Sequence, residues 1–420
     1  MSADGLSWIQ DPPVGTLQLW VQQARWSDPF LKEREHAWEA GDITPLMVLR
    51  KEEVLRAWYN CTGDDGVEYV AYAESGDGLS WDKPQLGQVD YGGTTANSLL
   101  HRRSHFAIRS LLRDDQDPDP QRCYNYTWMS IDPADKHGSE IVRTQSIGCG
   151  PDVEHLKGIE ANPVLHPNDG LEQEIHFVML APCEGRYITL YEFGWYMPNH
   201  TGKFGSYSAD VRLATSRDGN CFQRVQPHQK VIERGPRGTW GEGFLIITDK
   251  PIVKDDTIYL YYCGNGEEWT SWPWQNKMDH YADIRTGWMH LSRMGLATLR
   301  RDDYVCVETA DRETPGFLTS GPVELSGKEL GLEINISDVQ PGRSWIEVEV
   351  LDAESGEPLP VFGREDCVDL CCDGVAVAVQ WKAANLAGLG ARRCKLRFHL
   401  MGAARLYSYA IGMRCGSHSR

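Results

Sequence analysis

One phrase occurs twice along this chain, and it limits the folds that the chain can adopt. Residues 72–81 read YAESGDGLSW and residues 213–222 read LATSRDGNCF, with Ala, Ser, Asp, Gly and an aromatic residue at matching places. In both copies an apolar strand precedes an Asp-Gly turn, where glycine takes a positive φ at little cost and aspartate accepts local hydrogen bonds. Such a strand–turn–strand unit, repeated along an all-β chain, predicts radial repetition as in a β-propeller.

Composition agrees with many short strands and argues against some partners. The 420 residues include 41 Gly, 22 Pro, 15 Trp and 17 Tyr, a mixture typical of strands joined by tight turns. The net charge is −18, which does not suit binding to nucleic acid or to an anionic membrane. No apolar run approaches the roughly 18 residues of a membrane span. The N-terminus does not resemble a signal peptide, so localisation stays open between the cytoplasm and export by another route.

Cysteine usage points to no metal site. The chain has 12 Cys, and their spacing shows neither a CxxC motif nor a zinc pattern. Disulfides are expected only if the protein is exported. The adjacent pair Cys371-Cys372 is expected to be buried thiols rather than a redox switch or a bridge.

Alternating and apolar runs predict four blades of a propeller. Their strands are expected at 45–50, 54–61, 67–74 and from Trp81; at 106–112 and 123–131; at 175–180, 187–193, 210–216 and 222–225; and at 244–248, 258–263, 295–299 and 304–307. The run from Gly295 looks like a diverged third copy of the repeat, and the N-terminal segment supplies either a fifth blade or one closing strand. The aromatic insertion at 267–292 is either a functional loop or a surface excursion.

The pattern changes after Pro315. Five alternating runs separated by Gly-rich turns predict a β-sandwich, with strands at 325–336, 344–351, 374–381, 393–400 and 405–413. The linker is expected at 309–316. The predicted domains are therefore a propeller at 1–310 and a sandwich at 317–415.

Six motifs in order give the chain a resemblance to a known group. They are Arg56-Ala-Trp-Tyr, the run from Tyr72 to Gly87, the run from Asp210 to Gly219, Gly238-Thr-Trp-Gly-Glu-Gly, Gly295-Leu-Ala-Thr-Leu-Arg-Arg-Asp and Leu406-Tyr-Ser-Tyr. With these the chain resembles predicted bacterial glycosidases related to the five-bladed propeller hydrolases of glycoside hydrolase families 32, 43 and 68. The resemblance implies an all-β fold, a five-bladed β-propeller followed by a C-terminal β-sandwich, and cleavage of a carbohydrate substrate without a cofactor.

The chain departs from that group in three places. The segment between Leu100 and Glu174 matches poorly, which leaves open a reduced blade. Glu242 lies in Trp240-Gly-Glu-Gly, where the group has an Asp-containing motif. The signature of the sucrose-cleaving members is absent, so the resemblance does not imply specificity for fructosides.

Glycoside cleavage requires two carboxyl groups on either side of the scissile bond. In the resembled propellers these groups stand at the starts of the innermost strands, and a third carboxylate tunes the pKa of the acid. The acids in matching positions are Asp42, Glu174, Asp210 and Glu242. We expect Glu242 to be the general acid, Asp42 the base or nucleophile, and Glu174 or Asp210 the tuning group. The structural alternative for each is a solvated carboxylate at a strand end.

Further residues are candidates to line a sugar pocket, because aromatic faces stack on sugars in concave sites. They are Trp240, Trp58, Tyr196 and His200, with Glu39 as a binding residue and as a reserve for Asp42. For Trp58 and Trp240 the alternative is a place in the core. No metal site is expected, since the grouping of Asp279, His280 and Asp283 is a weak one.

Two other classes of function stay open. A sugar-binding propeller without catalysis would fit the substituted motif at Glu242. A scaffold that binds another protein through its rim would fit the fold alone.

Overall fold

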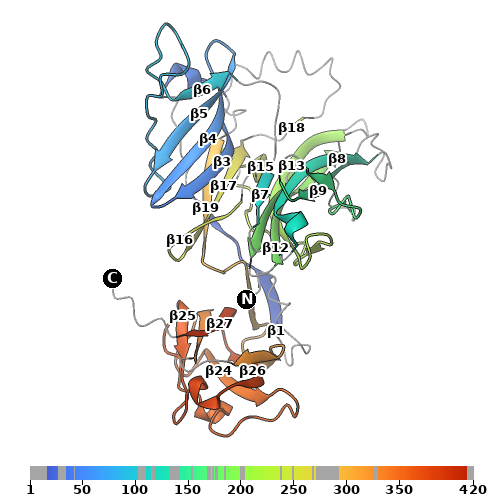
Figure 1. Cartoon of the computed structure of the whole chain (residues 1–420), viewed down its shortest axis with the longest axis vertical. Coiled ribbons are helices and arrows are strands. Elements are labelled where there is room, and N and C mark those ends of the chain that lie inside the picture. Colours follow the sequence, from blue (N-terminus) through green and yellow to red (C-terminus); the bar gives the residue numbers. More distant parts are fainter. Residues whose placement is uncertain are drawn as a thin grey trace. The chain divides into compact units, whose positions relative to one another are not determined.

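The computed structural model shows an all-β chain, as the sequence predicts (Figure 1). It describes residues 17–26, 35–41, 43–102, 110–114, 117, 119–132, 142–152, 155–167, 172, 175, 178–183, 186–198, 204–236, 239–247, 250–266, 269–270, 293–325 and 330–413. Among these residues there is no α-helix, and no helix is long and apolar enough to cross a membrane. By contacts the chain forms two compact units, Gln23–Leu299 and Met1–Gln22 with Arg300–Arg420. We call them the blade unit and the sandwich unit.

The blade unit begins with an antiparallel sheet of the size of one propeller blade. Its strands, in order, are β3 (Ile43–Lys51), β4 (Val54–Thr62), β5 (Glu68–Ser75) and β6 (Leu99–Arg102). One face packs its buried side chains, Tyr59 and Tyr69 among them, against Ile252, Tyr261 and Leu296. The expectation of a strand from Trp81 is wrong, because the fourth strand is β6. Pro84 follows closely and has no N–H to donate to a sheet, and only the bridge between Glu74 and Asp82 forms.

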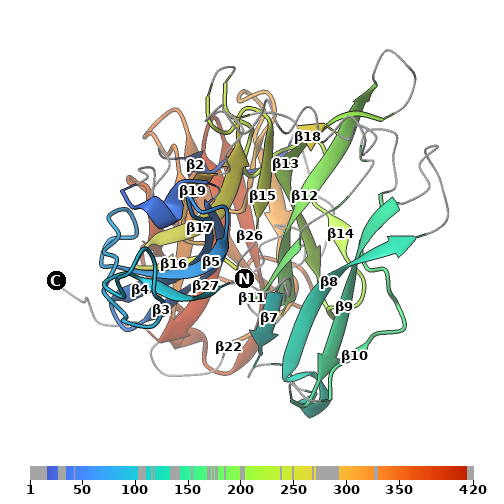
Figure 2. The same ribbon diagram turned by 90° about the horizontal axis from the view of Figure 1, so that it is seen from above.

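A second four-stranded sheet follows, and its strands lie side by side in Figure 2. They are β7 (Ser110–Arg113), β8 (Tyr124–Asp132), β9 (Val142–Gly150) and β10 (Lys157–Gly158). The sequence pattern predicted β8 and the end of β7 but no strand at β9. Leu112 and Ile147 from this sheet pack against Tyr187, Tyr191 and Phe193 of the next one.

The remaining strands of the blade unit form one larger sheet. They are β2 (Arg25–Trp26), β11 (Val178–Cys183), β12 (Arg186–Pro198), β13 (Phe204–Ser216), β14 (Gln223–Arg224), β15 (Phe244–Ile247), β16 (Ile252–Lys254), β17 (Thr257–Asn265), β18 (Trp269–Thr270) and β19 (Arg293–Arg300). The two predicted blades meet where β13 pairs in parallel with β15, at Ala209 and Phe244. On the far edge β2 pairs with β19, so the described N-terminal residues give this sheet one edge strand. The count of five blades remains a prediction.

The two copies of the repeated phrase fold alike, and the predicted role of their aspartates is confirmed. Asp77 Oδ1 accepts hydrogen bonds from the N–H groups of Leu79 and Ser80, both at 2.8 Å. Asp218 Oδ1 accepts the equivalent bonds from residues 220 and 221, at 2.9 and 3.0 Å. Gly78 and Gly219 have φ of 81° and 71°, the left-handed region that glycine adopts without strain.

The third, diverged copy takes another course. Its chain turns after β19, where the carboxylate of Asp303 accepts a hydrogen bond from Arg300 Nε at 2.7 Å. The next strand, β20 (Val305–Thr309), was expected in the fourth blade, and this is wrong. It pairs with β1 (Leu17–Val21) and with β27 (Arg405–Met413), so its partners belong to the sandwich unit.

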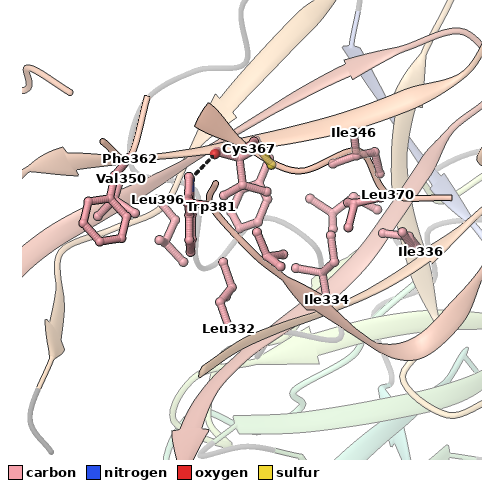
Figure 3. Close-up of a cluster of buried hydrophobic side chains, with 14 of the residues drawn as sticks. Leu332, Ile334, Ile336, Ile346, Val350, Phe362, Cys367, Leu370, Trp381 and Leu396 are labelled. Atoms are coloured by element: carbon pink, nitrogen blue, oxygen red, sulfur yellow. Dashed lines mark hydrogen bonds between the residues drawn. The ribbon is translucent and has the colours of Figure 1, made fainter. Parts of the chain in front are cut away.

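The sandwich unit has two antiparallel sheets, which confirms the predicted β-sandwich. One sheet has the order β1, β20, β27, β23 (Leu330–Ser337) and β25 (Gly374–Val379); the other contains β21 (Gly316–Thr319), β22 (Val323–Leu325), β24 (Trp345–Asp352) and β26 (Arg392–Met401). Side chains from both sheets form one apolar core (Figure 3), in which Ile334 and Leu396 are fully buried. Trp381 Nε1 donates to the carbonyl of Val348 at 3.0 Å, so its one polar atom is satisfied inside the core.

Three expectations for this unit need correction or stay open. The segment 309–316, expected as an interdomain linker, contains the end of β20, the connection at 310–315 and the start of β21, all within this unit. Cys371 and Cys372, expected as buried thiols, are exposed, because they stand in the loop before β25 rather than in a strand. The domain limits of 1–310 and 317–415 remain a prediction, while contacts group 17–22 and 300–310 with the sandwich.

Candidate functional site

The loop at 239–243 carries Glu242, the predicted general acid, to the start of β15. Glu242 is partly exposed. The loop is fixed by backbone hydrogen bonds, from Gly235 N to Gly241 O at 2.9 Å and from Gly243 N to Asn265 O at 2.8 Å. These local hydrogen bonds fix the loop before β15. They place Glu242 two residues before that strand begins, as the sequence predicts.

Arg234 joins this loop to the neighbouring strands. Its Nη1 donates to the carbonyl oxygens of Glu242 at 3.0 Å and Gly243 at 3.2 Å. Its guanidinium carbon lies 5.1 Å from the centre of the Trp195 ring on β12, within cation–π range. The positive charge of Arg234 also acts on Asp210, where it favours the ionised carboxylate. One guanidinium therefore bonds to the backbone beside one of the predicted acids and exerts its charge on another.

Asp210 lies inside the blade unit on β13, with 1% of its surface exposed. Arg212 holds it with two hydrogen bonds, from Nε to Oδ1 at 2.7 Å and from Nη2 to Oδ2 at 3.1 Å, and Lys230 Nζ lies 4.0 Å away. Burial raises the pKa of Asp210 above its ordinary value, while Arg212, Lys230 and Arg234 act in the opposite direction. Asp210 is too buried to touch a substrate, so its influence on a site would be electrostatic.

A second buried ion pair lies beside the first and was missed from the sequence. Glu172 is 0% exposed, and Arg224 Nη2 lies 2.8 Å from its Oε2 atom. Arg224 lies 5.6 Å from the ring centre of Tyr191, which stands opposite Arg212 across β12 and β13. Burial, with the charge of Glu172, raises the pKa of Tyr191. Glu172 stands two residues before the predicted Glu174. The criterion used for Glu174, an acid just before the first strand of a predicted blade, applies to Glu172 as well.

Glu39, the reserve candidate, also forms an internal ion pair. It is 0% exposed, Tyr59 donates its hydroxyl to Oε1 at 2.6 Å, and Lys83 Nζ lies 2.8 Å from Oε2. Burial and the charge of Glu39 raise the pKa of Tyr59 well above its ordinary value. These contacts favour a structural role for Glu39.

The predicted aromatic residues divide between core and surface. Trp240 stacks on Tyr262 with ring centres 5.6 Å apart, and a Cβ at Gly264 or Gly295 would collide with its ring. Trp240 therefore packs over β17 and β19 while its side chain stays half-buried, and its place in a sugar pocket stays a prediction. Trp58 is half-buried on β4, and its ring centre is 5.2 Å from that of Tyr72.

Of the other predicted site residues, the structure describes only Tyr196. The backbone of Tyr196 pairs with Tyr207 at the end of β12. Asp42, Glu174 and His200 lie outside the described residues, as does the insertion at 267–292 apart from β18. Within the described ranges no three His, Cys, Asp or Glu side chains group together to hold a metal ion.

The described residues thus provide one partly exposed carboxyl group just before β15, Glu242, and one buried, charge-paired carboxylate on β13, Asp210. An accessible carboxyl group can exchange a proton with a ligand. A buried charge acts on its neighbours through a medium of low dielectric.

Comparisons with known proteins give low similarity. No protein-family model matches this sequence, and no curated protein matches it. Among solved structures, a protein described as a glycoside hydrolase is 13% identical with a TM-score of 0.39, covering 67% of this chain and 92% of its own. A thermostable family-43 glycoside hydrolase is 14% identical with a TM-score of 0.29, over 70% and 92%. The Bombyx mori GH32 β-fructofuranosidase BmSUC1 is 10% identical with a TM-score of 0.27, over 87% and 90%. At this level of similarity, function has to be inferred from the residues of this chain.

Proposed function

We propose that the protein is a glycoside hydrolase in which Glu242 is the general acid. Asp42 is the proposed base or nucleophile, and Glu174 or Asp210 tunes the pKa of the acid. The substrate is a carbohydrate, and neither metal nor cofactor takes part. The observation that supports the proposal is the position of Arg234, which holds the backbone of the Glu242 loop and whose charge acts on the buried Asp210.

The link matters because a general acid must hold its proton at the pH where it works. A nearby negative charge disfavours ionisation and raises the pKa of a carboxyl group, whereas a nearby cation lowers it. In the proposed site Asp210 supplies the negative charge and Arg234 the positive one. A tuning role for Asp210 requires only its charge, which agrees with its complete burial.

The first test is the variant Glu242→Gln, assayed on aryl glycosides that differ in their leaving group. A missing acid hurts most when the leaving oxygen is basic, so cleavage of a phenyl glycoside should fall by about 10²–10⁴-fold and cleavage of a dinitrophenyl glycoside by much less. The matched control is Glu160→Gln, an exposed carboxylate elsewhere in the blade unit, which should keep full activity. Unchanged activity of Glu242→Gln on phenyl glycosides would contradict the assignment.

The second test concerns the tuning group. Asp210→Asn removes a negative charge, so the pKa of the acid should fall. Because the acid must be protonated, the alkaline limb of the kcat/KM profile should then move to lower pH. If the alkaline limb of the kcat/KM profile does not move, Glu174 is the proposed tuning group instead.

The distance between the two carboxyl groups would also set the stereochemical outcome. About 5–5.5 Å implies retention of the anomeric configuration, and about 6.5–9.5 Å implies inversion.

The second candidate function is carbohydrate binding without catalysis. The observation that favours it is Glu242 itself, in a motif where the resembled group has aspartate. Retention of labelled oligosaccharides by the intact protein, with no sugar released over long incubation, would favour this candidate. Binding of a protein partner with no affinity for any glycan would favour the scaffold.

A further inference from the structure

The sandwich unit displays two adjacent thiols on its surface. Cys371 and Cys372 are both exposed, in the loop between the short 3-10 helix η4 (Arg364–Asp366) and β25. The proposed glycosidase site lies in the other unit and uses neither of them. Their exposure makes both sulfur atoms accessible to reagents in solution.

The loop is anchored on both sides of the pair. Leu370 is 8% exposed and belongs to the apolar core, where Figure 3 shows it among the side chains of both sheets. Asp373 Oδ1 accepts a hydrogen bond from Val339 N at 3.0 Å. The two thiols are thus held at the apex of a short, fixed loop rather than on a free tail.

Cys367, four residues before the pair, provides a contrast. It is buried, its sulfur accepts a hydrogen bond from Val348 N at 3.4 Å, and burial raises the pKa of its thiol to about 11. Cys367 is therefore a structural side chain that solvent reagents do not reach. Exposure separates Cys371 and Cys372 from it.

The ligand set limits what the pair can do. A structural zinc site takes four ligands, whereas no third His, Cys, Asp or Glu joins the two thiols among the described residues. Chemistry that needs only two sulfur atoms is thiol–disulfide exchange, in which a thiolate attacks a disulfide sulfur. We propose that Cys371 and Cys372 form a modification site that exchanges with small-molecule disulfides and closes to a disulfide between the two adjacent residues.

The exchange balances in two steps. One thiol loses its proton and attacks a sulfur atom of the reagent; the reagent's S–S bond breaks, and one small thiolate leaves and takes up a proton. The second thiol then loses its proton and attacks the protein sulfur of this mixed disulfide. The Cys371–Cys372 bond forms as the second small thiolate leaves. The protein loses two hydrogen atoms, and the reagent is reduced to two thiols.

The negative charge around the cysteine pair should determine which small-molecule disulfides react fastest. Asp369 and Asp373 flank the pair, and the whole chain carries a net charge of −18. An anionic disulfide such as oxidised glutathione is repelled by this field, while a dicationic disulfide such as cystamine is attracted. Cystamine should therefore react about tenfold faster or more at low ionic strength, and added salt should reduce the difference.

The closed disulfide should be easy to reduce. Adjacent Cα atoms are about 3.8 Å apart, below the roughly 4.4–6.8 Å of ordinary disulfides. Strained and exposed disulfides have the higher reduction potentials of labile bonds. Reduced glutathione should thus reopen the ring.

The experiment treats the intact protein with cystamine and maps the cysteine peptides by mass. The expected product is a Cys371–Cys372 peptide lighter by two hydrogen atoms, with no adduct. Cys371→Ser and Cys372→Ser should each stop at one cysteamine adduct. Cys221 is the internal control: it is also exposed but stands alone in a repeat turn, and it should end as a stable mixed disulfide.

Two results would overturn the proposal. They are stable adducts on the wild-type pair without ring closure, as at Cys221, and equal rates of reaction with cystamine and oxidised glutathione at low salt. Both serine variants change exposed side chains, so circular dichroism and the thermal midpoint should match those of the wild type.

Discussion

The two units of this protein bury different kinds of side chain. The sandwich unit encloses one apolar core, and its most buried acids, Asp303, Glu308 and Glu349, keep 6–8% of their surface exposed. Among the described residues of the blade unit, four acids are buried to 0–1% exposure, namely Glu39, Glu172, Glu192 and Asp210. Ion pairs join Glu39 to Lys83, Glu172 to Arg224 and Asp210 to Arg212.

The difference shows where the chain places costly interactions. Taking both members of an ion pair out of water costs several kcal/mol per ion, and an apolar pair of similar volume is often as stable. The sandwich unit also pairs its buried acids, but the cations there reach solvent: Arg397 and Arg405 keep 26% and 33% of their side chains exposed, against 8% for Arg212. In the blade unit two of these pairs, Asp210–Arg212 and Glu172–Arg224, lie on and beside β12 and β13, so we expect these two to serve function or specificity more than stability.

The largest expected effect comes from breaking one pair. Arg212→Met leaves Asp210 buried without its partner and should destabilise the blade unit by about 3–5 kcal/mol. The double variant Asp210→Leu/Arg212→Met should recover most of this loss. Hydrogen exchange in peptides from β12 and β13 measures the local free energy of opening. If the double variant is as unstable as the single one, the pair is needed for folding and the contrast between the units fails.

The apolar core gives the matching experiment in the other unit. Leu396 is fully buried between the sheets, so Leu396→Ala should cost about 2–5 kcal/mol through lost burial and the cavity left behind. The same hydrogen-exchange measurement should show lost protection in β24 and β26, with β12 and β13 unchanged. Equal loss of protection in both units would mean that they unfold together and that their interiors cannot be compared separately. Exposed Val368 provides the control, since Val368→Ala should have little effect.

The repeat turns should give the smallest effect. Two backbone N–H groups bond to each aspartate, so Asp77→Ala and Asp218→Ala should each cost about 1 kcal/mol at neutral pH, as for a lost cap. These bonds lower the pKa of Asp77 to about 2 and lower that of Asp218 as well. The contribution of each aspartate is therefore complete above the ordinary carboxyl pKa and is lost as pH falls towards about 2.

Chemical unfolding from pH 7 to pH 2 would check this. The wild type and each variant should converge in acid. A difference that persists in acid would show that the turns lose packing rather than charge-assisted hydrogen bonds.

The sequence by itself determined the features that depend on neighbouring residues. Alternation of apolar and polar side chains predicted β24, β26 and β27 to within about two residues, because a strand with one buried face repeats every second residue. The Asp-Gly turns were also predictable, since their hydrogen bonds join atoms two or three residues apart. The position of Glu242 before β15 followed from the same local pattern.

Only the tertiary structure decided which distant segments meet. Strand pairing and charge pairing depend on the geometry of the folded chain, and similar apolar runs can pair in more than one way. The pairing of β20 with β1, the use of β6 in place of a strand at Trp81, and the contact of Arg234 with the Glu242 loop are all of this kind. Burial is equally non-local: it enclosed Asp210 with Arg212 and left Cys371 and Cys372 in solvent, and nothing in their neighbouring residues distinguishes the two outcomes.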